Sequence, residues 1–196
     1  PYTTLFRSKE IVRILPELLR TAARMLRENG EIQFVIAFAF ERHRSELETA
    51  LGPLAESERA VLKDIRAVFG DTYNALNAAD VAAVTSGTAT LETGIIGTPM
   101  AIVYKSSAIN YKLLRPLIRV EHFGLINLIA ERRIAAELIQ DDFTPENLSS
   151  ELFRLLSPEV NEKVRRDLKA AADKLGHGGA AKRAAAAIKR LLNKNN

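Results

Sequence analysis

The hydrophobic positions follow two periods that alternate along the first half of the chain. Apolar residues spaced three and four positions apart predict helices over residues 9–28, 42–51, 72–79 and 88–96. Short continuous apolar runs between them predict buried strands over residues 32–40, 65–69, 81–85 and 100–104. Strands that alternate with helices indicate crossover connections and a parallel sheet with helices on both faces. We therefore expect an α/β fold with a Rossmann-like, doubly wound parallel sheet.

The second half of the chain has mainly helical spacing. It predicts helices over residues 109–119, 145–156, 159–175 and 180–192, with a short apolar segment at 125–129. We find no internal repeat and no long linker. We expect three parts: a non-native leader over residues 1–8, the Rossmann-like domain over 9–156, and basic carboxyl-terminal helices over 157–196.

The leader, PYTTLFRS, is unusual because a doubly wound domain normally opens on a buried strand. The segment has little strand-like pattern, and it resembles the translated adaptor sequence found at the ends of some open reading frames. We expect that the natural beginning of the protein lies upstream of this leader.

The carboxyl-terminal segment is basic, whereas the rest of the chain is nearly neutral. From Glu159 to Asn196 there are ten Lys and Arg residues against four Asp and Glu, and the preceding 158 residues contain 18 against 20. A solvated helix face explains this segment without a partner. Attachment to anionic lipid headgroups is the second interpretation. Nucleic-acid binding is the weakest, because the segment has no aromatic residue on which a base would stack.

Residues that the sequence lacks exclude several kinds of chemistry. There is no cysteine, so no disulfide, thiolate nucleophile or Cys-zinc site can form. The three histidines, His43, His122 and His177, are far apart and do not favour a zinc site. No Asp-x-Asp pair occurs, and we expect neither a metal nor a cofactor. No uncharged stretch approaches the roughly 20 apolar residues that a membrane-spanning helix requires.

The stretch from Thr85 to Lys105 contains the candidate chemistry. Ser86, Gly87 and Thr88 lie between a predicted strand and a predicted helix, which is where ligands bind in parallel sheets. Unpaired N–H groups at a helix start bind phosphate, and glycine lets the ligand approach the backbone. Glu92 lies on the same helix face as Thr88 and suits ribose hydroxyls. A simple N-cap with a solvated Glu92 explains the same residues without a ligand.

Five ordered blocks of the sequence resemble lipid-A-disaccharide synthases, which are inverting glycosyltransferases with two Rossmann-like domains (the GT-B fold). The blocks are residues 86–92, 97–105, 125–130, 137–140 and 144–148. The resemblance extends over roughly residues 7–192 and implies the carboxyl-terminal, UDP-sugar-binding half of such an enzyme.

The resemblance implies substrates and site residues. Ser86, Gly87 and Thr88 would hold the diphosphate of UDP-2,3-diacylglucosamine, Glu92 would bind its ribose, and Asn127 would line the nucleotide pocket. The acceptor would be 2,3-diacylglucosamine 1-phosphate, and the product would be the β-1,6-linked disaccharide precursor of lipid A. In the family the general base belongs to the amino-terminal domain. We therefore expect no catalytic residue in this chain, and no activity from it alone.

The sequence departs from the pattern of the family in three places. Arg7 matches the arginine of a Leu-Pro-Gly-Ser-Arg loop that faces the diphosphate, but Thr4, Leu5 and Phe6 replace Pro-Gly-Ser. Ile126 stands where the family has proline, and Glu131 stands where it has glycine.

The resemblance also implies a location and leaves rival functions open. We expect a cytoplasmic enzyme, bound peripherally to the cytoplasmic face of the inner membrane, that serves the biogenesis of the Gram-negative outer membrane. An oligomer is compatible with the sequence, and we expect no nucleic-acid partner. One alternative is half of another UDP-sugar transferase or of an epimerase. Another is a non-catalytic α/β module that binds nucleic acid through its basic tail.

Overall fold

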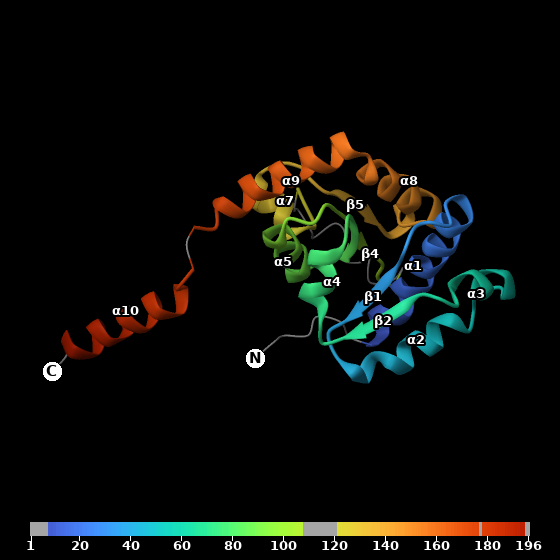
Figure 1. The fold of residues 1–196 in the computed structure, drawn as a ribbon. Coiled ribbons are helices and arrows are strands. Elements are labelled where there is room, and N and C mark those ends of the chain that lie inside the picture. The colour runs from blue at the N-terminus through green and yellow to red at the C-terminus, as the bar shows by residue number, and fades with distance from the viewer. Residues whose placement is uncertain (1–7, 108–120, 177, 195–196) are drawn as a thin grey trace.

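The computed structural model describes residues 8–107, 121–176 and 178–194 (Figure 1). The helices are α1 (Ser8–Glu28), α2 (Arg44–Leu51), α3 (Glu56–Leu62), α4 (Thr72–Ala78), α5 (Thr88–Ile96), α7 (Leu125–Ala130), α8 (Pro145–Leu156), α9 (Pro158–Asp173) and α10 (Ala180–Lys194). The strands are β1 (Val35–Phe38), β2 (Arg66–Phe69), β3 (Ala82–Thr85), β4 (Met100–Tyr104) and β5 (Ala136–Ile139). The predicted helix over residues 109–119 lies outside the described residues.

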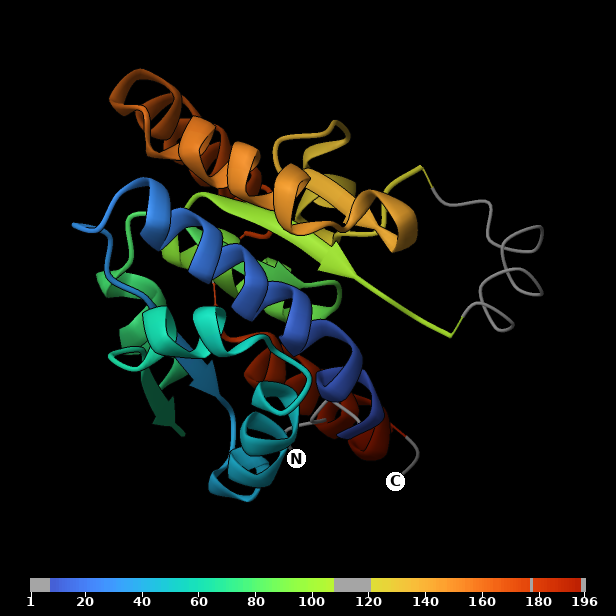
Figure 2. The same ribbon diagram turned by 90° about the vertical axis from the view of Figure 1, so that its right-hand side faces the viewer.

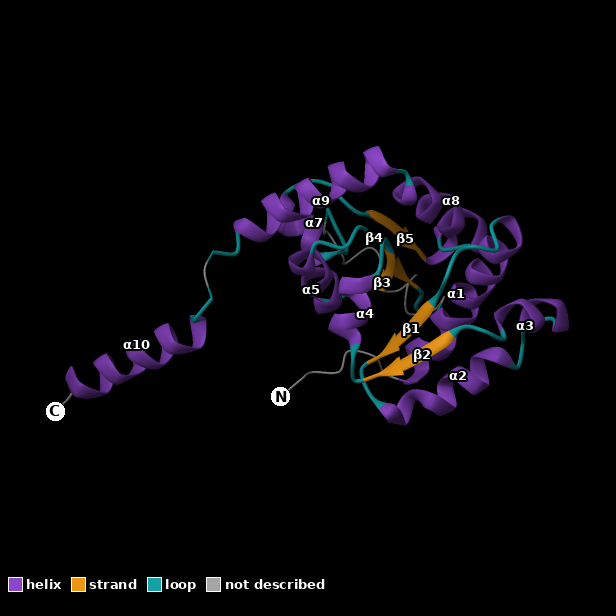
Figure 3. Cartoon of the chain, viewed as in Figure 1, coloured by secondary structure: helices purple, strands orange, loops and turns teal. Residues whose placement is uncertain are grey.

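All described strands are parallel, which confirms the predicted α/β class (Figure 3). They form a two-stranded sheet, β1–β2, and a three-stranded sheet in the order β3–β4–β5. Doubly wound sheets commonly have the strand order 3-2-1-4-5-6. In that order strand 1 lies between strand 2 and strand 4, which correspond here to β1 and β3. The described residues contain no strand at that place, so β1 and β3 each have an edge without a strand partner.

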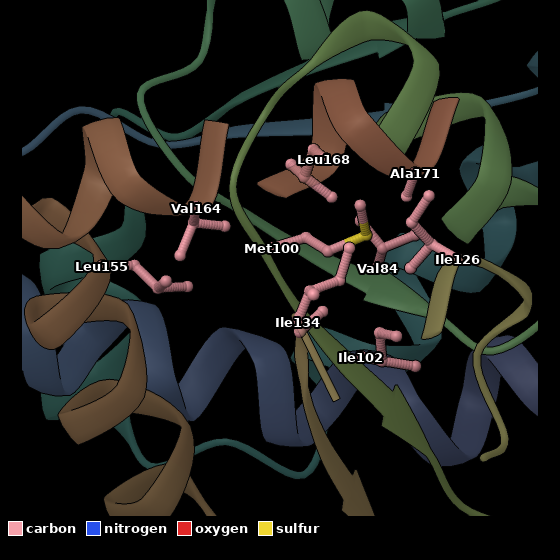
Figure 4. Packing of buried hydrophobic residues seen from close by; sticks show 10 residues of the cluster. Val84, Met100, Ile102, Ile126, Ile134, Leu155, Val164, Leu168 and Ala171 are labelled. Carbon is pink, nitrogen blue, oxygen red and sulfur yellow. The ribbon is translucent and has the colours of Figure 1, made fainter. Parts of the chain in front are cut away.

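Strand β4 lies at the centre of the larger sheet, and helices cover both of its faces. Its first four residues are fully buried, and successive side chains enter different core clusters. Met100 and Ile102 pack with residues of α7 and α9, as Figure 4 shows. Ala101 and Val103 pack with residues of α1 and α8. This two-sided burial explains why β4 appears in the sequence as an unbroken apolar run.

Helix α1 joins the two sheets. One set of its apolar residues, including Leu15 and Leu19, packs with Phe38 of β1 and with α2 and α3. Ile14 and Met25 pack in the cluster of β4 and α8. Figure 2 shows α1 in blue, with α8 on one side and the α2–α3 segment on the other. The predicted amphipathic helix therefore has an apolar surface wide enough to cover both sheets.

The sequence did not predict β5 or α3. In β5 a polar residue, Glu137, interrupts the apolar positions, so the segment lacks the continuous run of a buried strand. Helix α3 has seven residues and buries only Leu62, which is too little for a clear helical period. The α7 segment was recognised as short and apolar, and it forms a helix of six residues.

Candidate functional site

The turn from β3 into α5 lies at the carboxyl edge of the larger sheet. The Ser86 N–H donates to the Val103 carbonyl at 3.0 Å, which continues the pairing of β3 with β4 by one residue. Gly87 is the N-cap of α5, with φ 140° and ψ −162°, a backbone conformation that other residues rarely adopt. Thr90 closes the first turn, because its hydroxyl donates to the Gly87 carbonyl at 2.8 Å. The first N–H groups of an α-helix have no intrahelical acceptor, so the start of α5 is a candidate phosphate site.

The Ser86 side chain connects this turn to a distant segment. Its hydroxyl donates to the Phe123 carbonyl at 2.8 Å, across 37 positions of sequence. Phe123 and Gly124 lead into α7, so two loops meet at this edge of the sheet. The amino ends of α5 and α7 therefore lie near each other, because this hydrogen bond joins the segments that precede them.

A buried carboxylate holds the loop before α7 in place. Glu137 of β5 accepts the Phe123 N–H at 3.1 Å and the Gly124 N–H at 2.9 Å. A side chain on Gly124 would have no room, because a Cβ there would lie 2.2 Å from Ile102 Cδ1. The loop lies directly on the sheet only because residue 124 is glycine.

Asn127 completes the same network from α7. Its Nδ2 donates to the Ala135 carbonyl at 2.8 Å and to Glu137 Oε1 at 2.9 Å. Its Oδ1 accepts the N–H groups of Ile134 and Ala135 at 2.9 and 3.0 Å. The residue is 0% exposed, and these four bonds use the whole hydrogen-bonding capacity of its amide. Its side chain therefore has no donor or acceptor left for a nucleotide.

Gln140, at the end of β5, fixes a second loop at this edge. Its side chain bonds the backbone of Ser106, accepting from the N–H and donating to the carbonyl. Gln140 has φ 57°, which is uncommon for a residue with a side chain. Beside it, Lys105 forms an ion pair with Glu17 of α1 at 2.9 Å. Glu137 in β5 and Gln140 at its end thus hold two loops in place, the one before α7 and the one after β4.

Two groups near this edge have no partner among the described residues. Glu92 lies one helical turn after the exposed Thr88, is half-buried, and makes no hydrogen bond or ion pair with the described residues. His122 precedes Phe123, and its Nδ1 is buried without a hydrogen-bond partner in the described part of the chain. Unpartnered buried nitrogens are uncommon, so His122 is a further candidate contact.

The structure thus brings Ser86, Gly87 and Thr88 to one edge of the sheet together with Glu92. Arg7 lies outside the described residues, and its predicted role is unchanged. Sequence reasoning did not select Glu137, Gln140 or His122 as site residues. Glu137 and Gln140 do belong to one of the five blocks, and that was the signal that could have identified them.

Residues 8–107, 121–176 and 178–194 lack two further features, a metal-binding cluster and a membrane-spanning helix. Those residues contain no cluster of three His, Asp or Glu side chains that would hold a metal ion. No helix among them is long and apolar enough to cross a membrane.

Comparison with known proteins gives one consistent result. The model of the lipid-A-disaccharide synthetase family matches residues 3–191. A lipid-A-disaccharide synthase of Syntrophus aciditrophicus is 39% identical over 191 residues, which is 96% of this chain and 48% of that protein. The synthase of Geobacter sulfurreducens is 33% identical over 189 residues, or 96% of this chain and 47% of that protein. The chain spans about half the length of these relatives.

Proposed function

Because the chain belongs to the lipid-A-disaccharide synthetase family, we propose that it forms the donor-binding half of a glycosyltransferase of lipid A biosynthesis. The donor is UDP-2,3-diacylglucosamine, the acceptor is 2,3-diacylglucosamine 1-phosphate, and UDP is released with inversion at the anomeric carbon. The observation that carries the proposal is the Ser86–Phe123 hydrogen bond, which joins the α5 turn to the α7 loop at the edge where parallel sheets bind ligands.

The α5 turn suits the diphosphate. The first N–H groups of a helix have no intrahelical acceptor, and the helix dipole adds partial positive charge there. Gly87 keeps the backbone open to the ligand, and the exposed Thr88 hydroxyl adds a donor. Arg7 is proposed to complete this cradle. These donors stabilise the charge that develops on the leaving UDP.

The nucleoside is proposed to lie between α5 and the α7 loop. Glu92 is one turn beyond the phosphate position, and its unpartnered carboxylate accepts hydrogen bonds from the ribose hydroxyls. The unpartnered Nδ1 of His122 lies in the loop that would contact the base. Both groups gain a partner when UDP binds.

Asn127 and Glu137 act in this proposal by positioning the loop. Their mutual bond at 2.9 Å and the two N–H groups that Glu137 accepts set the height of Phe123 and Gly124 over the sheet. Loss of this network would shift the Phe123 carbonyl and with it the Ser86 hydroxyl. Asn127 therefore belongs to the pocket through the backbone that it holds.

The remaining chemistry is assigned outside this chain. The base that activates the acceptor hydroxyl is proposed to lie in the amino-terminal half, as in the family, so this half alone is expected to be inactive. Because both sugars carry acyl chains, the whole enzyme is proposed to work in the cytoplasm at the surface of the inner membrane. The basic carboxyl-terminal helices supply charge for anionic headgroups.

Calorimetric titration with UDP tests the donor site. We expect saturable binding that Glu92→Ala weakens by at least about tenfold, since a hydrogen bond to a charged group contributes about 1.5–3 kcal/mol. The matched control is Glu48→Ala on α2, an exposed glutamate on a helix that packs against α1, which should bind UDP as the unchanged chain does.

A second variant, Asn127→Ala, separates positioning from contact. It should weaken UDP binding and lower the free energy of unfolding together, because it leaves buried N–H and C=O groups unpaired. Absence of UDP binding by a folded chain, confirmed by circular dichroism, would contradict the proposed donor site.

A further inference from the structure

A cavity of about 220 Å³ lies beyond the carboxyl end of α7, where the chain passes into the amino end of β5, whereas the proposed donor site lies at the amino end of α7. Four cationic side chains line it. Arg132 and Arg133 precede β5, Arg154 lies in the last turn of α8, and Lys163 lies on α9. One carboxylate, Asp167 of α9, lines it as well. Cations from three elements thus converge on a small space.

The floor of this cavity is rigid. Ile134, Val160 and Val164 line it, and Ile134 and Val164 are buried members of the main core cluster. Figure 4 shows these two side chains in the core with Leu155 of α8. Because the floor is part of the packed core, the charged side chains stand on a fixed base.

Carboxylates hold two of the arginines in position. The Arg132 guanidinium bonds both oxygens of Asp167, at 2.7 and 3.5 Å. Arg154 bonds both oxygens of Glu151, at 2.7 Å each. The hydrogen bond to Glu151, opposed by partial burial, raises the pKa of Arg154 above its ordinary value. Each guanidinium has five N–H donors, so both keep donors for another acceptor.

The other two cations have no counter-ion within the described part of the chain. Arg133 and Lys163 are exposed and make no ion pair or hydrogen bond with the described residues. Like charges that converge in this way repel one another, and a bound anion relieves the repulsion. We propose that this cavity is a second ligand site of the protein, which binds a phosphate monoester group through Arg133 and Lys163 with the remaining donors of Arg132 and Arg154.

The size and shape of the cavity agree with this ligand class. A volume of about 220 Å³ holds a phosphate group with a small attached moiety, but not a whole nucleotide sugar. Planar guanidinium groups match phosphate oxygens in geometry as well as charge. Such a group is carried by small soluble phosphates and by lipid headgroups with an exposed phosphate.

The first test is calorimetric titration with glycerol 3-phosphate. We expect the double variant Arg133→Ala with Lys163→Ala to lose affinity by about tenfold or more, which is about 1.4 kcal/mol for each factor of ten. The double variant Arg59→Ala with Lys63→Ala is the matched control. It removes one Arg and one Lys from exposed positions at the end of α3, and it should bind as the unchanged chain does.

UDP titration on the same variants keeps the two sites distinct. The cavity variant should have the same affinity for UDP as the unchanged chain, whatever that affinity is. Loss of glycerol 3-phosphate binding only through Glu92→Ala would overturn the cavity site, because the anion would then occupy the donor pocket.

Vesicles distinguish the two sources of the phosphate. Sedimentation with phosphatidylcholine vesicles, with and without phosphatidic acid, is compared for the cavity variant and the control. If the cavity variant loses more vesicle binding than the control does, the site binds a headgroup phosphate. If both variants lose vesicle binding equally and only the cavity variant loses glycerol 3-phosphate binding, the site binds a soluble phosphate. Equal behaviour of the two variants toward both probes would overturn the proposal.

Discussion

Helices α9 and α10 are alike in sequence but differ in their surroundings. Both are amphipathic, and both carry several Lys and Arg residues. Helix α9 buries Val164, Leu168 and Ala171 in the main core cluster. Helix α10 stands apart from the rest of the molecule (Figure 1) and exposes Leu191 and Leu192, at 67% and 66%.

The difference teaches that a helical pattern states which face is to be buried, but not what covers it. Only Ser157 separates α8 from α9, so α9 begins next to the sheet that α8 covers. Six residues, three of them glycine, separate α9 from α10, so the position of α9 does not fix that of α10. The predicted boundary after residue 156 is untested, but the apolar contacts of α9 join it to the sheet domain.

The largest expected effect comes from shortening a buried side chain of α9. Leu168→Ala removes a side chain that is 0% exposed and should lower the free energy of unfolding by about 3 kcal/mol. Leu191→Ala on α10 should change it by less than about 0.5 kcal/mol. Urea denaturation followed by circular dichroism measures both. Similar losses would mean that α10 has a packing partner in solution.

A smaller effect is expected for the polar contacts of α9. Arg165 donates to the Gly97 carbonyl at 3.0 Å and to the Asp80 carbonyl at 3.3 Å, which ties the helix to the loops around β3 and β4. Arg165→Ala should cost about 1 kcal/mol of unfolding free energy. Arg190→Ala on α10 is the control, and the comparison fails if it costs as much.

A substitution at the end of α7, which packs against α9, should raise the free energy of unfolding by about 0.5–1 kcal/mol. Glu131 is the C-cap of α7 with φ 58°, where a side chain is strained and glycine is not. Its ion pair with Lys174 is exposed and contributes little. Glu131→Gly should therefore raise the midpoint of thermal unfolding by a few degrees, whereas Glu131→Ala should not. Destabilisation by the glycine would show that the ion pair matters more than the backbone.

The smallest effect should come from removing α10 altogether. A chain that ends at residue 179 keeps the whole core cluster of α9 and the edge at Ser86. Its affinity for UDP should stay within about twofold of the full chain by calorimetry. Loss of UDP binding on this truncation would place α10 at the proposed donor site.

The proposed donor site was only partly predictable from the sequence. Ser86, Gly87, Thr88 and Glu92 are close in sequence, so one strand–turn–helix pattern was enough to place them at one edge. The hydrogen bond from Ser86 to Phe123 joins residues 37 positions apart and could not be inferred from local pattern. Asn127 was predicted to line the pocket, and only the fold revealed that its amide bonds Glu137 of β5 and the backbone of Ile134 and Ala135.

The sequence by itself determined the alternation of strands and helices, the class of the fold and the identity of the turn at Ser86. Those features follow from local periods and from backbone preferences. The tertiary structure alone decided that Glu137 and Asn127 share one buried network and that Arg133 and Lys163 face one cavity. It also decided that α9 is covered and α10 is not, because burial depends on which distant segments meet.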